Sequence, residues 1–105
     1  MTAALGVAAM CREMLGDRYY LEVQATGLPE QVRVNKKVKE VGENLGIPLV
    51  ATNDCHFLRK EDTKPHDALL CIQTGASIQD ENRMRFQGDQ YYLKSEGEML
   101  GDLDG

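Results

Sequence analysis

The sequence has no apolar run long enough to cross a membrane, no low-complexity tract and no internal repeat. Its first residues lack the basic region with which a secretory signal peptide begins. Cysteine is scarce, with three residues and no C-x-x-C pair. An odd cysteine count favours a reduced compartment over a disulfide framework, so we expect a cytoplasmic protein with no membrane attachment.

Positive charge is also limited, because the net charge is -5 over 105 residues. That balance does not predict a nucleic-acid binder, although it does not exclude that role for a piece of a larger protein. A phosphate-binding glycine loop, a serine elbow and zinc-finger spacing are all absent from the sequence. The length allows one domain at most, or part of one, with a single modest core.

Apolar spacing and turn residues predict helices that alternate with strands. We expect helices over residues 2–15 and 29–45, from Asp62 or Thr63 to Gly75, and after Ser95. We expect strands over residues 19–24 and 49–52, with a short one at 91–93. Because a helix joins the first two strands, they should pair in parallel, as in an α/β fold.

Two helices carry apolar stripes that should be buried. Residues at spacings of four, three and four form the stripe of the helix over 29–45, namely Val34, Val38, Val41 and Leu45. In the helix that ends at Gly75, the expected buried residues are Ala68, Leu69 and Ile72. Ser95 and Glu98 have the spacing of a capping box at the start of the last helix.

The strongest candidate site follows the strand over residues 49–52, which reads as a buried strand. Asp54 and His56 are two residues apart, so in an extended chain both side chains would lie on one side. Carboxylate and imidazole together suit a hydrolytic metal site or general acid/base chemistry. The alternative is that Asp54 is a turn residue and His56 a satisfied surface histidine.

Other polar residues have structural explanations that compete with functional ones. His66 fits a capping role or a hydrogen bond to the loop of residues 54–57, and Glu22 fits a hydrogen-bonded strand residue. Cys55 should point away from its neighbours as a small buried residue. The basic residues of the later segment are conceivable phosphate contacts but more typical of a solvated loop, namely Arg83, Arg85 and Lys94.

Several ordered blocks resemble the bacterial replicative DNA polymerase III alpha subunit. They lie at residues 17–24, 27–35, 46–57, 66–75, 82–86 and 91–95, and the resemblance covers residues 16–99 without a gap. In that family the region is the carboxyl-terminal part of the PHP (polymerase and histidinol phosphatase) domain. The resemblance assigns residues 1–88 to that domain and 89–105 to the start of the polymerase region. It also implies a partial (β/α) PHP-type barrel.

The resemblance also implies a role for the candidate site. Asp54 and His56 match the last metal motif of the family, D-x-H, and are therefore expected to bind zinc, manganese or magnesium. The early H-x-H motif and the catalytic aspartates of polymerisation have no counterpart here, so the chain resembles a fragment that is inactive in isolation. The implied partners of the parent are DNA, deoxynucleoside triphosphates and replicase subunits, including the proofreading exonuclease.

Two alternatives remain open at this stage. The chain could come from a free-standing PHP-family phosphoesterase that hydrolyses a small phosphate ester with a metal ion. It could instead be a vestigial PHP scaffold that only binds partner subunits. In either case a chain with two parallel strands cannot close a barrel, so we expect exposed apolar faces and self-association in isolation.

Overall fold

The computed structural model describes residues 1–103, which divide into two compact units on either side of the bond between Thr52 and Asn53. The first unit contains α1 (Thr2–Leu15), the short 3-10 helix η1 (Gly16–Arg18), β1 (Leu21–Gln24), α2 (Pro29–Leu45) and β2 (Leu49–Thr52). The second contains η2 (Lys60–Asp62), α3 (Thr63–Thr74) and α4 (Glu96–Leu103).

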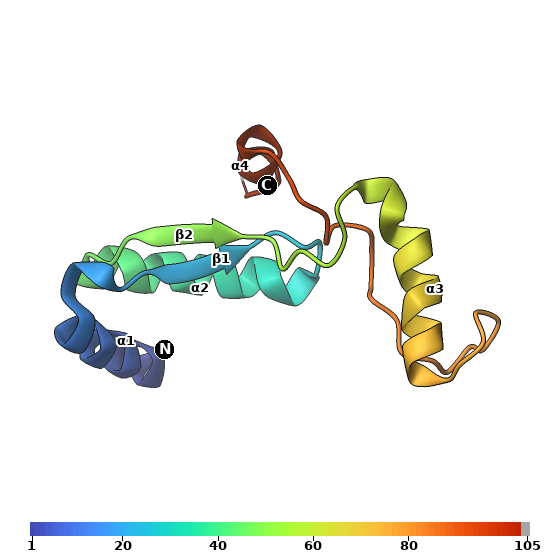
Figure 1. Ribbon diagram of the computed structural model, residues 1–105. Helices are drawn as coiled ribbons and strands as arrows, with labels where there is room; N and C mark the ends of the chain where they lie inside the picture. Colours follow the sequence, from blue (N-terminus) through green and yellow to red (C-terminus); the bar gives the residue numbers. More distant parts are fainter. Residues whose placement is uncertain (104–105) are drawn as a thin grey trace. The chain divides into compact units, whose positions relative to one another are not determined.

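The first unit is built on a parallel strand pair with a helical crossover (Figure 1). β1 and β2 pair in register from Leu21 opposite Leu49 to Gln24 opposite Thr52. α2 connects the two strands and packs against β1, while α1 packs against α2. The predicted strand–helix–strand order and the parallel pairing are therefore confirmed, and in the described residues the sheet has these two strands.

Local sequence signals explain the ends of α2. Pro29 occupies the first turn, where a missing backbone N–H costs nothing, and Glu30 follows it near the positive end of the helix. Gly46 ends the helix with a left-handed φ of 61°, a conformation that glycine adopts without strain. Gly42 has no side chain to hold the returning chain away, since a Cβ there would lie 3.0 Å from the Ile47 carbonyl oxygen.

The core of the first unit is small. Ala8, Val41 and Ile47 are buried, and partly buried apolar residues surround them, namely Leu5, Tyr19, Leu21 and Leu45. The predicted stripe on α2 is buried only near its carboxyl end, because Val34 remains 51% exposed. Beside this stripe an open groove of about 1030 Å³ lies between α1, α2 and β1. The unit thus leaves much of its apolar surface uncovered.

Two expectations about the strands were wrong. The first strand begins at Leu21, because Gly16–Arg18 form η1 and the ladder starts only where the Leu21 N–H donates to the Pro48 carbonyl. The second strand is not buried, since Leu49 and Val50 are 40% and 42% exposed. An apolar run alone does not bury a strand. Burial requires cover on both faces and further strands at its edges.

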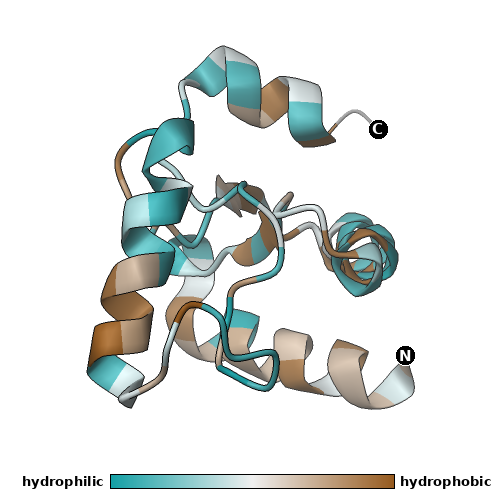
Figure 2. Ribbon diagram, turned by 90° about the vertical axis from the view of Figure 1, so that its right-hand side faces the viewer, coloured by the Kyte–Doolittle hydropathy of each residue, from teal (hydrophilic) through white to brown (hydrophobic). Residues whose placement is uncertain are grey.

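The buried face of α3 also differs from the prediction. Leu70 and Cys71 are the buried residues, whereas Leu69 and Ile72 are 52% and 77% exposed and Ala68 is exposed as well. Apolar residues occur on more than one face of this helix, and sequence spacing does not say which face meets the rest of the unit. Figure 2 shows that brown, apolar segments alternate with teal, polar ones along the helices.

Other helix boundaries agree with the sequence. α3 ends at Gly75 with a left-handed φ of 67°, but Asp62 and Thr63 do not cap it as expected. Instead the Asp62 carboxylate accepts a hydrogen bond from the Arg59 N–H, and the Thr63 hydroxyl donates to the Lys60 carbonyl. Among residues 1–103, no helix combines the length and apolar character needed to span a bilayer.

Candidate metal-ligand loop

Asp54 and His56 lie in the loop that opens the second unit, where the chain is no longer extended. Asp54 has a φ of 48°, a left-handed value that aspartate tolerates better than most residues. The expectation that i and i+2 side chains share one side of a strand therefore does not apply. The turn still brings the two residues together, because the Asp54 Oδ1 atom lies 4.0 Å from His56 Nδ1.

The same turn fixes which nitrogen of His56 can act as a ligand. His56 Nδ1 lies 2.6 Å from the Asp54 carbonyl oxygen. A carbonyl only accepts hydrogen bonds, so Nδ1 carries the proton and the neutral ring keeps its lone pair on Nε2. Metal-binding histidines commonly donate their other ring N–H to a carbonyl or carboxylate oxygen in this way. The side chains of His56 and Asp54 are 35% and 56% exposed, so a hydrated ion can reach both.

A second segment of the chain supports this loop through backbone hydrogen bonds. The N–H groups of His56 and Phe57 donate to the Tyr91 carbonyl, at 2.7 and 3.3 Å. Further on, the Leu93 N–H donates to the Leu58 carbonyl at 3.3 Å. The short strand expected at residues 91–93 is present only as one parallel bridge, between Phe57 and Tyr92.

Aromatic rings surround the His56 imidazole. Its ring centroid lies 4.5 Å from that of Phe86 and 5.8 Å from that of Tyr91, both in edge contacts. His66 packs 5.1 Å from Phe86 and 5.2 Å from Phe57. His66 therefore contacts the loop through its ring, whereas we expected a cap or a hydrogen bond. Sequence spacing gave no signal for this cluster, because its members lie up to 35 residues apart.

The donor chemistry of the loop fits a divalent ion, but the described residues supply only part of a site. An imidazole nitrogen and a carboxylate suit zinc or manganese, and the carboxylate also suits magnesium. Nowhere in residues 1–103 do three or more histidine, cysteine, aspartate or glutamate side chains gather closely enough to hold an ion. Asp54 and His56 are thus two candidate ligands that would need others to complete the coordination.

Glu22 belongs to a hydrogen-bonded network on the strands. Its carboxylate accepts hydrogen bonds from the Thr52 hydroxyl and from the Gln24 amide, the latter at 3.1 Å. Gln24 also donates to the Thr52 hydroxyl at 3.0 Å. This arrangement agrees with the hydrogen-bonded strand residue that the sequence favoured.

The expectation of a solvated basic loop was wrong for two of its three members. The Arg83 side chain is 1% exposed and donates both terminal N–H groups to the Asp67 carboxylate. The Lys94 side chain is fully buried and donates to Asp102 at 2.5 Å and to Gln90 at 2.9 Å. Both cations are held by carboxylates, so neither is placed as a phosphate ligand.

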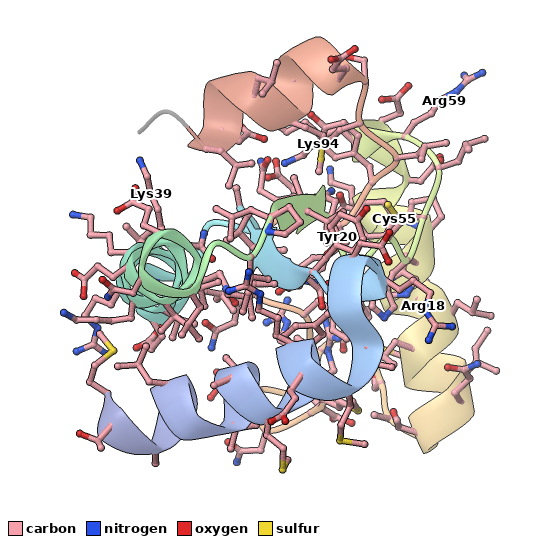
Figure 3. All side chains as sticks on the ribbon, turned by 90° about the vertical axis from the view of Figure 1, so that its left-hand side faces the viewer. Arg18, Tyr20, Lys39, Cys55, Arg59 and Lys94 are labelled. Atoms are coloured by element: carbon pink, nitrogen blue, oxygen red, sulfur yellow. The ribbon has the colours of Figure 1, made fainter. Side chains whose placement is uncertain are left out.

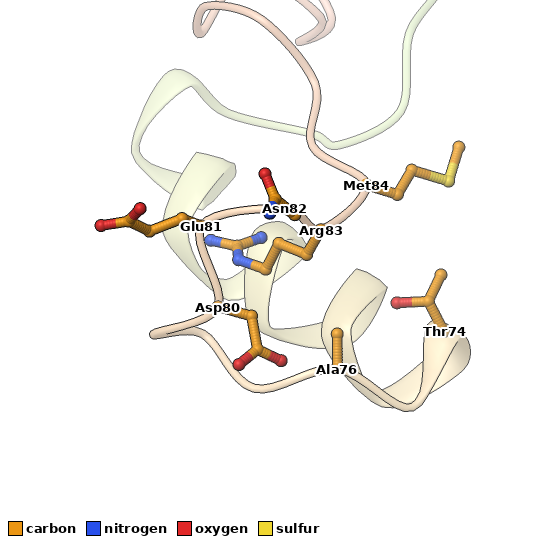
Figure 4. Close-up of a pocket in the computed structure, with 7 residues that line it drawn as sticks. All are labelled: Thr74, Ala76, Asp80, Glu81, Asn82, Arg83 and Met84. Atoms are coloured by element: carbon orange, nitrogen blue, oxygen red, sulfur yellow. The ribbon is translucent and has the colours of Figure 1, made fainter.

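A pocket of about 430 Å³ lies beside Arg83. Figure 4 shows that its walls come from the end of α3 and from the loop of residues 80–84. Asp80 and Glu81 line it, but the Asp80 carboxylate already accepts the Ser77 N–H at 2.8 Å. This hydrogen bond lies within the loop itself. Neither Asp54 nor His56 lines the pocket.

Cys55 was expected to be buried but is exposed. Its thiol donates to the Tyr92 carbonyl at 3.4 Å, in the segment that supports the loop. Figure 3 labels the Cys55 side chain. Asp54 has a left-handed φ, so the alternation of side chains along an extended strand does not decide where Cys55 points. Cys71, in α3, is buried.

Comparison with known proteins finds similarity to one kind of protein. No family model matches the chain. The DNA polymerase III alpha subunit of Mycobacterium tuberculosis (strain CDC 1551 / Oshkosh) is 48% identical over 97 residues, which cover 91% of this chain and 8% of that protein. The Deinococcus radiodurans subunit is 48% identical over 88 residues, covering 84% of the chain and 7% of the relative. The Thermus aquaticus subunit is 45% identical over 90 residues, covering 86% and 7%.

These matches span most of the chain but little of each relative. The chain spans about 8% of the length of the Mycobacterium tuberculosis relatives that it matches. Because 91% of the chain is matched, the matched residues include parts of both units and the loop that carries Asp54 and His56. Over about 91% of its length the chain is therefore similar to one short segment of the DNA polymerase III alpha subunit, as expected for a fragment of that family.

Proposed function

We propose that this chain is part of a replicative DNA polymerase III alpha subunit, and that it contributes two metal ligands to a PHP-type domain. The observation that carries the proposal is the 48% identity to relatives named as that subunit. Residues 1–88 would form the carboxyl-terminal part of the PHP domain, and residues 89–105 the start of the polymerase region. The parent would synthesise DNA from deoxynucleoside triphosphates in the cytoplasm.

Asp54 and His56 are the residues that would hold the metal ion. His56 would bind through Nε2, since Nδ1 donates to the Asp54 carbonyl, and Asp54 would bind through its exposed carboxylate. The remaining ligands would come from other parts of the parent. A bound divalent ion supplies Lewis-acid chemistry suited to phosphodiester hydrolysis. The ring cluster around His56 would hold its imidazole in one orientation toward that ion.

Metal analysis of the parent subunit tests this proposal. We expect the double substitution Asp54→Ala with His56→Ala to lower the bound zinc, manganese or magnesium measured by mass spectrometry after dialysis. Asp17→Ala, which removes an exposed carboxylate from the first unit, serves as the control and should leave the metal content unchanged. Equal metal content in the double variant and the wild type would refute the ligand assignment.

The uncovered apolar surface supports a second role, as a binding surface for replicase subunits such as the proofreading exonuclease. Leu69 and Ile72 on α3 are 52% and 77% exposed, and exposed apolar patches commonly mark interfaces. Replacing both with lysine should weaken binding of a purified proofreading subunit to the parent, measured by calorimetry. Binding that survives the double substitution would exclude α3 from the interface.

The remaining alternative is a free-standing PHP-family phosphoesterase. The reading frame downstream of residue 105 distinguishes it from the polymerase proposal. Polymerase motifs that follow in the same frame would support the alpha subunit. A stop codon close behind, after a complete barrel encoded upstream, would support the phosphoesterase.

A further inference from the structure

Asn53 is a buried polar residue immediately before the candidate ligand Asp54. It is 5% exposed, and its side-chain amide lies against the segment that supports the loop. The Nδ2 group donates to the Gln90 carbonyl at 2.6 Å and to the Tyr92 carbonyl at 2.7 Å. A side-chain amide NH₂ carries two N–H donors, so a single group can bind both carbonyls at once.

The Asn53 amide adds side-chain hydrogen bonds to the segment that His56 binds through its backbone. Asp54, the next residue, has a left-handed φ of 48°. Three residues after Asn53, the His56 N–H donates to the Tyr91 carbonyl. The side chain of Asn53 and the backbone of His56 therefore hold the same three residues, 90–92, on either side of the turn.

We propose that Asn53 is a positioning residue for the candidate ligands, because its amide fixes the turn that presents Asp54 and His56. This inference rests on the metal-ligand role proposed above. The turn determines the hydrogen bond between His56 Nδ1 and the Asp54 carbonyl, and that bond leaves Nε2 as the ligand atom. Loss of the Asn53 anchor would free this part of the loop and weaken the contact between His56 Nδ1 and the Asp54 carbonyl.

The chemistry of the contact selects asparagine. Both acceptors are carbonyl oxygens, so the group that faces them must carry two N–H donors. The Asn53 Oδ1 atom is buried without a hydrogen-bond partner in the described part of the chain, so the two bonds from Nδ2 hold the side chain in place. An aspartate has the same shape but would set a negative oxygen against two carbonyls.

Nuclear magnetic resonance of the 15N-labelled 105-residue protein tests the positioning role without any metal. We compare Asn53→Asp with the wild type and with Asn44→Asp, the same chemical change at an exposed position of α2. We expect amide exchange at His56 and Leu93 to be faster by about tenfold or more in Asn53→Asp. We also expect the separate Nδ1 and Nε2 signals of the His56 ring to move toward a tautomeric average. Asn44→Asp should show neither change.

Asn53→Asp could unfold the second unit, which would appear as loss of protection from amide exchange at Leu70 in α3. A second variant keeps the test decisive in that case. Asn53→Ser retains one short donor and should then show the changes at His56 and Leu93 while Leu70 stays protected. Unchanged exchange at His56 and Leu93, together with unchanged ring signals in a folded Asn53 variant, would overturn the proposal.

Zinc titration of the parent subunit separates the two proposals. If the ligand assignment holds, Asn53→Asp should weaken zinc binding by about 10- to 100-fold, the usual effect of removing a residue that orients a ligand. Asn44→Asp should bind zinc as the wild type does. The metal proposal would be refuted if zinc binding by the wild type did not depend on Asp54 or His56. The amide-exchange and ring measurements would still decide whether Asn53 positions the loop.

Discussion

Arg83 and Asp67 form a two-pronged ion pair that ties the loop after α3 back to the helix. The two terminal nitrogens of Arg83 donate to the two carboxylate oxygens of Asp67, at 2.6 and 2.7 Å. The side chain of Arg83 is almost wholly buried, while that of Asp67 is one quarter exposed. This parallel geometry matches the planar guanidinium and cannot be reproduced by a lysine ammonium.

Replacing Arg83 with lysine should therefore destabilise the second unit. The lysine keeps the charge but makes one bond at most, and it leaves part of the Asp67 carboxylate without a donor. We expect the thermal midpoint to fall by about 5 °C or more, measured by circular dichroism. Arg85→Lys, an exposed arginine two residues away, is the matched control and should leave the midpoint unchanged. A midpoint that falls equally in both variants would show that the Arg83 pair has no special role.

The same pair makes stability depend on pH in a known direction. The hydrogen bonds from Arg83 hold the pKa of Asp67 below its ordinary value of 3.8. A carboxyl with a lowered pKa in the folded state stabilises the protein above its unfolded pKa, and that contribution is lost as pH falls through the folded value. The free energy of unfolding should thus decrease below about pH 4. Urea titrations at pH 7, 5, 4 and 3 measure this decrease.

Asp67→Asn identifies how much of the acid sensitivity comes from this carboxyl. The variant should be less stable at pH 7 but should lose less stability on acidification than the wild type does. Some acid sensitivity should remain, because the pKa values of Asp89 and Glu98 are also lowered, chiefly by hydrogen bonds from Gln90 and from the Ser95 backbone. Parallel pH profiles for the variant and the wild type would contradict the assignment to Asp67.

Features set by near neighbours in the chain were predictable from the sequence. Pro29 and Gly46 mark the two ends of α2 because a fixed φ and a left-handed φ act within one or two residues. The parallel pairing of β1 and β2 followed from the intervening helix, which is too long for a hairpin.

Burial of side chains was less predictable, because it depends on which other helices and strands cover each face. Leu69 and Ile72 follow a plausible helical stripe, yet Leu70 and Cys71 face the interior of the second unit. Spacing shows which residues share a face but not which face meets a partner. The exposure of Leu49 and Val50 has the same cause, since a strand with no further neighbours stays uncovered whatever its composition.

The loop of the candidate site has one feature that the sequence predicted and several that it did not. The spacing of Asp54 and His56 correctly suggested that they lie close, but the physical reason is a turn with positive φ rather than an extended strand. The contribution of Asn53, Phe86 and Tyr91 was not predicted, because it depends on contacts between residues 30 to 37 positions apart. An asparagine directly after a strand was the one local signal available.

The capping box of α4 offers a small and local test of stability. The Ser95 N–H donates to the Glu98 carboxylate at 2.8 Å, and the Glu98 N–H donates to the Ser95 hydroxyl at 3.4 Å. Ser95→Ala removes one of these bonds and should destabilise the helix by about 1 kcal/mol. Faster amide exchange at Met99, whose N–H donates to the Ser95 carbonyl, would report the loss. Ser95→Thr keeps the hydroxyl and should exchange nearly as the wild type does.

Exposed apolar surface should make the 105-residue chain associate with itself in solution. The groove between α1, α2 and β1 is open, and Val34, Leu69 and Ile72 are each more than half exposed. Contact between copies would remove this surface from water, so the apparent mass in analytical ultracentrifugation should rise with protein concentration. Leu69→Lys with Ile72→Lys should reduce that rise, whereas Lys36→Arg on the exposed side of α2 should not. A monomer at every concentration, with a sharp thermal transition that does not depend on concentration, would contradict this prediction.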